Sequence, residues 1–94
     1  MEMTIEETTM ARIAGWKVAV ANIWEREYPD ASGRTLKGPA ATVSLVEPGA
    51  PEARRKDVGK GSVLDLGSAG IWDVVYVSPG PKGGNGHIRI VKKP

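Results

Sequence analysis

Glycine and proline interrupt this chain at short intervals, and their spacing constrains the fold more than any other feature. Twelve of the 94 residues are glycine and seven are proline, and many stand in clusters with Asp, Ser or Asn. Each of these residue types favours turn geometry. The clusters leave little room for helices of ordinary length, which is about 11 residues. Turn signals about every eight to twelve residues are typical of a small all-β sandwich or barrel.

Between the turns, apolar and polar residues mostly alternate with the period of two that a half-buried strand requires. We expect strands at 16–21, 41–46, 54–58, 63–66, 71–77 and 87–91. In the first of these, the helical spacing of Trp16, Val20 and Trp24 competes with the alternation, but aromatic and β-branched residues favour a strand. The charged segment 54–58 suits an exposed edge strand. The predicted fold is an antiparallel all-β barrel or sandwich of five to six strands.

The start of the chain differs from the rest in composition. Its first nine residues contain three carboxylates, Glu2, Glu6 and Glu7, and few large apolar side chains. This composition predicts a flexible acidic N-terminal arm. A chain of 94 residues is too short for two independent cores. We therefore expect an arm over residues 1–9 and one small β domain over residues 10–94.

The predicted core consists of the large apolar side chains on the buried face of each strand. Segment 71–77 is apolar on both faces apart from Asp73, which places it at the centre of a sheet or in an interface. The expected core residues are Trp16, Val18, Val20, Val43, Leu45, Val63, Leu64, Leu66, Ile71, Trp72, Val74, Val75, Val77, Ile88 and Ile90.

Residues that carry chemistry are sparse. The chain has no cysteine, which excludes disulfides, thiolate catalysis and cysteine-ligated metals, and one histidine cannot form a multi-histidine metal site. The glycine-rich segment 79–87 lacks the strand-to-helix order of a phosphate-binding loop, so we read it as a hairpin connection. No nucleophile, base and orienting group stand at a spacing that suggests a catalytic site. The sequence predicts a non-enzyme without cofactor or metal.

Charge is weakly positive overall and unevenly distributed. The net charge of +2 is too small to require a polyanionic partner. Arg54, Arg55 and Lys56 form one basic cluster, and the end of the chain forms a second with Lys82, Arg89, Lys92 and Lys93. Short runs of this kind are usually solvated surface, but a basic face can also bind nucleic acid or acidic protein.

Two further side chains are candidates for binding. Asp73 lies in an apolar segment, where an ionised carboxylate is costly unless it is paired. It is either a ligand-binding group in a pocket, or a surface residue that points outward or pairs with Arg89 or another cation across the sheet. Trp24 adjoins three charged residues at 25–27, so we expect it to be partly exposed on a contact surface.

Two functions fit this interpretation. The preferred one is a non-catalytic protein- or peptide-binding accessory module that uses an unpaired sheet edge and can also form a homodimer. The alternative is a small β-barrel that binds nucleic acid through a basic face. The low net charge ranks the first above the second. The candidate binding residues are Trp24, Arg54, Arg55, Lys56, Asp73, Lys82 and Arg89.

The sequence also bears on localisation. No apolar run approaches the roughly 20 residues of a membrane span. The acidic start differs from the basic and then apolar start of a secretory signal. We expect a cytoplasmic protein without membrane association.

Overall fold

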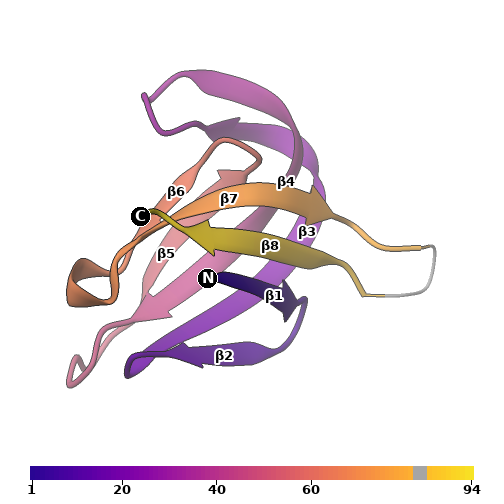
Figure 1. The fold of residues 1–94 in the computed structure, drawn as a ribbon. Coiled ribbons are helices and arrows are strands. Elements are labelled where there is room, and N and C mark those ends of the chain that lie inside the picture. Colours follow the sequence, from indigo (N-terminus) through magenta and orange to yellow (C-terminus); the bar gives the residue numbers. More distant parts are fainter. Residues whose placement is uncertain (82–84) are drawn as a thin grey trace.

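The computed structural model describes residues 1–81 and 85–94 and contains two four-stranded antiparallel sheets (Figure 1). Its strands are β1 (Glu2–Glu6), β2 (Met10–Ile13), β3 (Trp16–Pro29), β4 (Thr35–Val46), β5 (Arg54–Gly59), β6 (Val63–Asp65), β7 (Ile71–Ser78) and β8 (His87–Lys92). A single 3-10 turn, η1 (Gly67–Ala69), joins β6 to β7. The all-β prediction is confirmed, although the strands are more numerous and β3 and β4 are longer than expected.

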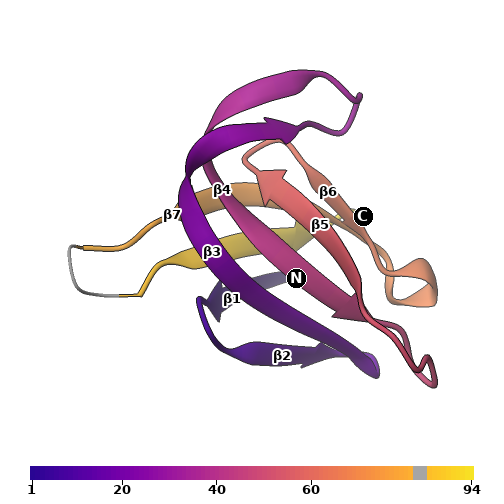
Figure 2. The same ribbon diagram turned by 180° about the vertical axis from the view of Figure 1, so that it is seen from behind.

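The two sheets pack face to face as a sandwich. The first sheet has the strand order β1-β8-β7-β6 and the second has the order β2-β3-β4-β5 (Figures 1 and 2). In the described part of the chain, β5 pairs with β4 alone and β6 with β7 alone, so the sheets do not join into a closed barrel. Of the two predicted architectures, the sandwich fits the structure.

One apolar core lies between the sheets, with Trp72 among its largest fully buried side chains. The Trp72 indole N–H donates to the Ala69 carbonyl at 3.1 Å, so its polar atom is satisfied. Most predicted core residues are buried. Three are not: Ile71 lies on the outward face of β7 and is exposed, while Val63 and Val75 are half-buried. Val75 falls at a bulge in β7, where the regular alternation of faces is interrupted.

The prediction of a flexible N-terminal arm is wrong, because residues 2–6 form β1. This strand pairs with β8 in a register that places Met3 opposite Ile90 and Ile5 opposite Ile88. Ile5 is 2% exposed and belongs to the core. The apolar residues alternate with the carboxylates, so β1 covers the core on one face while Glu2 and Glu6 remain exposed on the other.

A bulge in β3 determines what its second half presents. The register of β3 with β4 shifts between Ala21 and Trp24, and Asn22 adopts a φ of 56°. The backbone N–H of Ile23 donates to the carboxylate of Glu7 at 3.1 Å, and the other oxygen of that carboxylate accepts the N–H of Gly86 at 3.1 Å. The bulge buries Ile23 and leaves Trp24 exposed.

Segment 71–77 lies inside its sheet, as its two-sided apolar pattern predicts, because β7 runs between β6 and β8. The unpaired sheet edge that the sequence suggested is therefore found elsewhere. The edge strands of the two sheets are β1, β6, β2 and β5, and the last of these is the charged segment that was predicted to be an edge strand. This edge contains the site described next.

Candidate functional site

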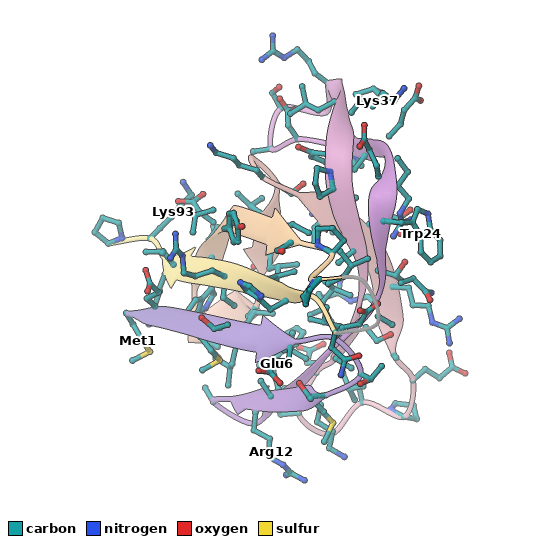
Figure 3. All side chains as sticks on the ribbon, turned by 90° about the vertical axis from the view of Figure 1, so that its right-hand side faces the viewer. Met1, Glu6, Arg12, Trp24, Lys37 and Lys93 are labelled. Carbon is teal, nitrogen blue, oxygen red and sulfur yellow. The ribbon has the colours of Figure 1, made fainter. Side chains whose placement is uncertain are left out.

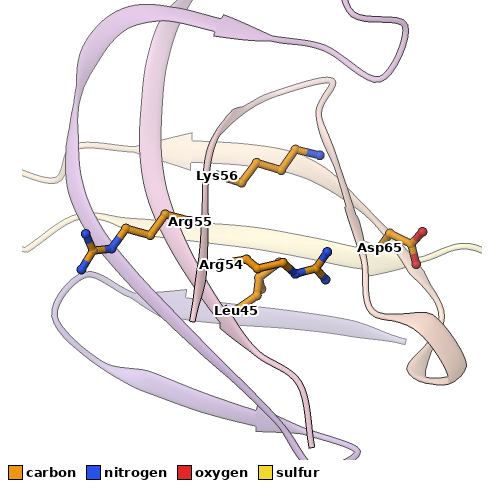
Figure 4. A pocket seen from close by; sticks show the side chains of 5 residues that line it. All are labelled: Leu45, Arg54, Arg55, Lys56 and Asp65. Atoms are coloured by element: carbon orange, nitrogen blue, oxygen red, sulfur yellow. The ribbon is translucent and has the colours of Figure 1, made fainter. Parts of the chain in front are cut away.

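The strands β5 and β6 follow each other in the chain, and a tight turn joins them at one end while the other end stays open. At the closed end, the N–H of Ser62 donates to the Gly59 carbonyl at 3.0 Å, and the Ser62 hydroxyl accepts the N–H of Gly59 at 3.1 Å. Beyond this turn the two strands join different sheets and diverge (Figures 2 and 4). The space between them, the edge slot, measures about 220 Å³ and is lined by Leu45, Arg54, Arg55, Lys56 and Asp65 (Figure 4).

Strand register explains which cations face the slot. Arg54 stands opposite Leu45 and Lys56 stands opposite Val43, and both apolar partners are buried. Residues directly opposite each other in a sheet share a face, so Arg54 and Lys56 extend from the inner face of β5. Arg55, between them, points the other way (Figure 4). The inner face of this edge strand thus carries two cations spaced two residues apart.

Three of the slot residues make a contact that holds the side chain in place. The Arg54 guanidinium lies 5.8 Å from the centroid of the Trp16 ring, within the range of a cation–π interaction. The Lys56 ammonium donates to the Val63 carbonyl at 2.8 Å and so bridges β5 to β6. On the opposite wall, the Asp65 carboxylate accepts the N–H of Gly67 at 2.9 Å.

The chemistry of the slot favours an extended, negatively charged occupant. Two cations, Arg54 and Lys56, face one carboxylate, and that carboxylate already accepts a backbone hydrogen bond. The slot is smaller than the roughly 300–1,000 Å³ of sites that enclose a drug-sized ligand. Along it, β5 presents the backbone groups of an edge strand, which can bond to another extended chain.

Of the predicted site residues, the structure brings together Arg54, Arg55 and Lys56 and places the others elsewhere. Trp24 is 52% exposed on the outer face of the second sheet (Figure 3), and the Arg26 guanidinium lies 5.1 Å from its ring centroid. Arg26 in turn pairs with Asp57 at 3.0 Å. Trp24 therefore belongs to a separate surface cluster.

Asp73 and Arg89 both lie on the outer face of the first sheet. The Asp73 carboxylate pairs with the Lys93 ammonium at 3.0 Å, so Asp73 is an ion-paired surface residue whose partner is Lys93 and not Arg89. Arg89 lies 5.7 Å from the Tyr76 ring centroid and 3.9 Å from the Glu2 carboxylate. Lys82 lies outside the described residues.

Two residues that give the slot its shape could not be recognised from the sequence. Leu45 is a predicted core residue, and Asp65 stands between the apolar Leu64 and Leu66 in the predicted strand 63–66. Their role depends on the register between β4 and β5 and on the divergence of β5 from β6. Glycines at 59 and 61, a residue type that favours turns, flank the turn that closes the slot.

Comparison with known proteins gives no match. It matches no protein-family model, and no curated protein or solved structure resembles it significantly. Within the described residues, no helix is long and apolar enough to cross a membrane. In the same part of the chain, no three His, Asp or Glu side chains gather where they could hold a metal ion. Function must therefore be argued from the geometry of the molecule.

Proposed function

We propose that this protein is a non-catalytic binding module that takes an extended, acidic segment of another protein along β5. The observation that carries the proposal is the unpaired edge of β5, which bears Arg54, Arg55 and Lys56 in succession. An extended segment that adds to a sheet edge forms main-chain hydrogen bonds with it, and its side chains then provide specificity. Here the cations on both faces of β5 select carboxylates.

The same charges argue for a partner other than a second copy at this edge. If two β5 strands paired edge to edge so that residues 54–56 of one copy faced those of the other, like charges would lie directly opposite one another, which destabilises a sheet. A homodimer would have to use another register or another surface. An acidic segment would meet a cation at each of the three positions. Charge complementarity therefore favours a different protein as the partner.

Nucleic acid is the weaker alternative, because the basic side chains are dispersed. Arg54, Arg55 and Lys56 belong to the second sheet, whereas Arg89 lies on the outer face of the first sheet beside Glu2. Exposed carboxylates on β1 flank that face and would repel a phosphate backbone. No continuous basic track joins these two groups in the described part of the chain.

The proposal is tested by binding and by amide protection. The probe is a pool of fluorescein-labelled octapeptides in which Asp or Glu alternates with Val, Ile or Thr, titrated in fluorescence anisotropy beside a labelled 15-mer of oligothymidylate. We expect peptide binding that falls at least tenfold in Arg55→Glu and slower hydrogen exchange of the β5 amides in the complex. The matched control is Lys17→Glu, a charge reversal at an exposed position of β3.

Two results would overturn this function. Binding of the oligonucleotide with a steep salt dependence, without peptide binding, would favour the nucleic-acid alternative. Peptide binding that Arg55→Glu and Lys17→Glu weaken equally would show a diffuse charge effect and no site on β5.

A further inference from the structure

We infer that the bound segment enters the edge slot by its C-terminal end and that its free α-carboxylate binds the ammonium of Lys56. This inference rests on the proposed function, because it concerns the same edge and adds the identity of the group that the slot recognises.

The first step is the shape of the slot, which has one end closed. The Gly59–Ser62 turn joins the two walls, and it is held to the first sheet because Gly61 donates to the Val74 carbonyl at 3.0 Å and Val74 donates to the Ser62 carbonyl at 2.9 Å. A chain that follows β5 from Arg54 meets this turn within a few residues (Figure 4). It must therefore end inside the slot or leave it, and a chain terminus can end there.

The second step is the chemistry at the closed end, which selects the carboxyl terminus. Of the two inward cations of β5, Arg54 and Lys56, the second is nearer to the turn. Its ammonium has three donors and no acceptor. Within the described residues, that ammonium donates only to the Val63 carbonyl. Two donors remain for the two oxygens of an α-carboxylate, and a charge-assisted bond of this kind is about twice as strong as a neutral one. An N-terminal ammonium would be repelled.

The third step is the spacing of the two inward cations. Arg54 and Lys56 are two residues apart on one face of β5, which is also the spacing of same-face residues on an added strand. When the terminal carboxylate lies at Lys56, the side chain two residues before the terminus lies near Arg54. An Asp or Glu at that position would pair with the guanidinium, while Asp65 on the opposite wall keeps carboxylates on the β5 side.

These steps also determine the direction in which the bound segment runs relative to β5. Since β5 runs from Arg54 toward the closed end, a segment whose C-terminus lies at Lys56 runs parallel to β5. The inferred ligand is thus a parallel strand with a free carboxyl terminus and an acidic residue two positions before the last.

The test compares two versions of one peptide pool. Labelled octapeptides that end in Asp-Thr-Val, preceded by varied Thr, Ser, Val and Ile, are prepared with a free C-terminal carboxylate and with a C-terminal amide. We expect amidation to weaken binding at least tenfold. Lys56→Gln should bind the free and amidated pools equally, whereas the control Lys17→Gln should keep the tenfold difference. Replacing the Asp by Asn should weaken binding to the wild-type protein but not to Arg54→Gln.

Each outcome separates the two proposals. Equal binding of the free and amidated pools overturns the terminal-carboxylate inference and leaves a side-on acidic segment at β5. Binding that prefers the free pool but is unchanged in Lys56→Gln overturns the assignment to Lys56. Absence of binding for both of these pools and for the alternating acidic pool above overturns the proposed function itself. Because the amide is on the peptide, the main comparison does not depend on whether a variant folds.

Discussion

Small residues form the turn between β5 and β6, whereas large charged residues line the slot beyond it. At the closed end, Gly59 and Ser62 bring the chains together, and the ring of Tyr28 packs directly on Gly59. Beyond the turn, Arg54 and Lys56 extend long charged side chains along the slot. The same two strands are thus joined by small residues at the turn and separated beyond it by a slot that cations line.

This difference explains how the backbone edge of β5 can stay accessible without a loss of stability of the fold. The closed end satisfies its own polar groups: Tyr28 donates to the Lys60 carbonyl at 2.8 Å, and Ser62 donates to the Pro29 carbonyl at 2.7 Å. It anchors β5 and β6 to the long β3–β4 hairpin. Along the slot, the cations contact only the Trp16 ring and the Val63 carbonyl within the described residues, and inward-pointing charges on an edge strand prevent uncontrolled pairing with other strands. Packing at one end therefore supports an accessible backbone at the other.

The most disruptive change to the closed end should be Gly59→Ala. A methyl group at this position would overlap the ring of Tyr28, which is itself buried and bonded through its hydroxyl. We expect a loss of about 3 kcal/mol in the free energy of unfolding, measured by urea denaturation with tryptophan fluorescence. The control is Gly38→Ala, whose methyl group would lie 3.9 Å from the same ring and should be tolerated. Equal stability of the two variants would contradict the packing described.

Ser62→Ala should cause the next largest loss of stability. The hydroxyl is buried and makes two bonds, so its removal leaves the N–H of Gly59 and the carbonyl of Pro29 without this partner. A loss of about 2 kcal/mol is expected from the same urea titration. Ser68→Ala, at an exposed position of η1, serves as the control and should change stability little. A Ser62→Ala protein as stable as that control would show that the turn closes without its hydroxyl.

Tyr28→Phe isolates a single contact at the closed end. It removes the hydroxyl that donates to the Lys60 carbonyl and keeps the ring that covers Gly59. The expected loss is about 1 kcal/mol, the usual net value of one hydrogen bond. A loss as large as that of Gly59→Ala would mean that the hydroxyl, and not the ring, anchors this corner.

Along the slot, the double variant Arg54→Ala/Lys56→Ala should change the unfolding free energy by no more than about 0.5 kcal/mol, because exposed side chains contribute little. Peptide binding, in contrast, should be lost. Thermal denaturation and anisotropy on the same sample check both expectations. If this variant lost as much stability as Ser62→Ala, the contrast between the two ends would not hold.

The smallest effect concerns Asp30, at the tip of the hairpin that covers the closed end. The Ser32 hydroxyl, together with the backbone N–H groups of Arg34 and Ser32, lowers the pKa of this carboxyl below its ordinary value of 3.8. The ionised form is favoured in the folded state, so its contribution is complete above the ordinary pKa and is lost as pH falls through the lowered one. An NMR titration of the carboxyl carbon should give a midpoint below 3.8, and Ser32→Ala should raise that midpoint. A midpoint at or above 3.8 would contradict these bonds.

The architecture could be predicted from sequence where the pattern is local. Alternation and turn residues identify β5, β7 and β8 within about a residue or two, because each depends on neighbours along the chain. The first strand could not be found this way. Its Met3 and Ile5 form a short alternating pattern, but three nearby carboxylates dominate the composition, and its stability depends on β8 at the far end of the chain.

The site was predictable only in part, for a related reason. Three consecutive cations at 54–56 mark a candidate surface directly in the sequence. That two of them point inward follows from the buried residues of β4 opposite them, and that they line a slot follows from the divergence of β6. Asp73, in contrast, attracted attention through its apolar neighbours and proves to be an ion-paired surface residue. Local context identifies charges, but only register shows which face they occupy.

The pairing of β1 with β8 has a consequence for how the chain folds. Strand β1 cannot pair until β8 is available, since Met3 of β1 lies beside Ile90 of β8. Closing so long a loop costs entropy before any contact compensates it, and such topologies fold slowly. During synthesis, the N-terminal strand would emerge early and remain without its partner until β8 follows. Ile5 would then be among the last core residues to become buried, so its truncation should speed unfolding more than it slows folding.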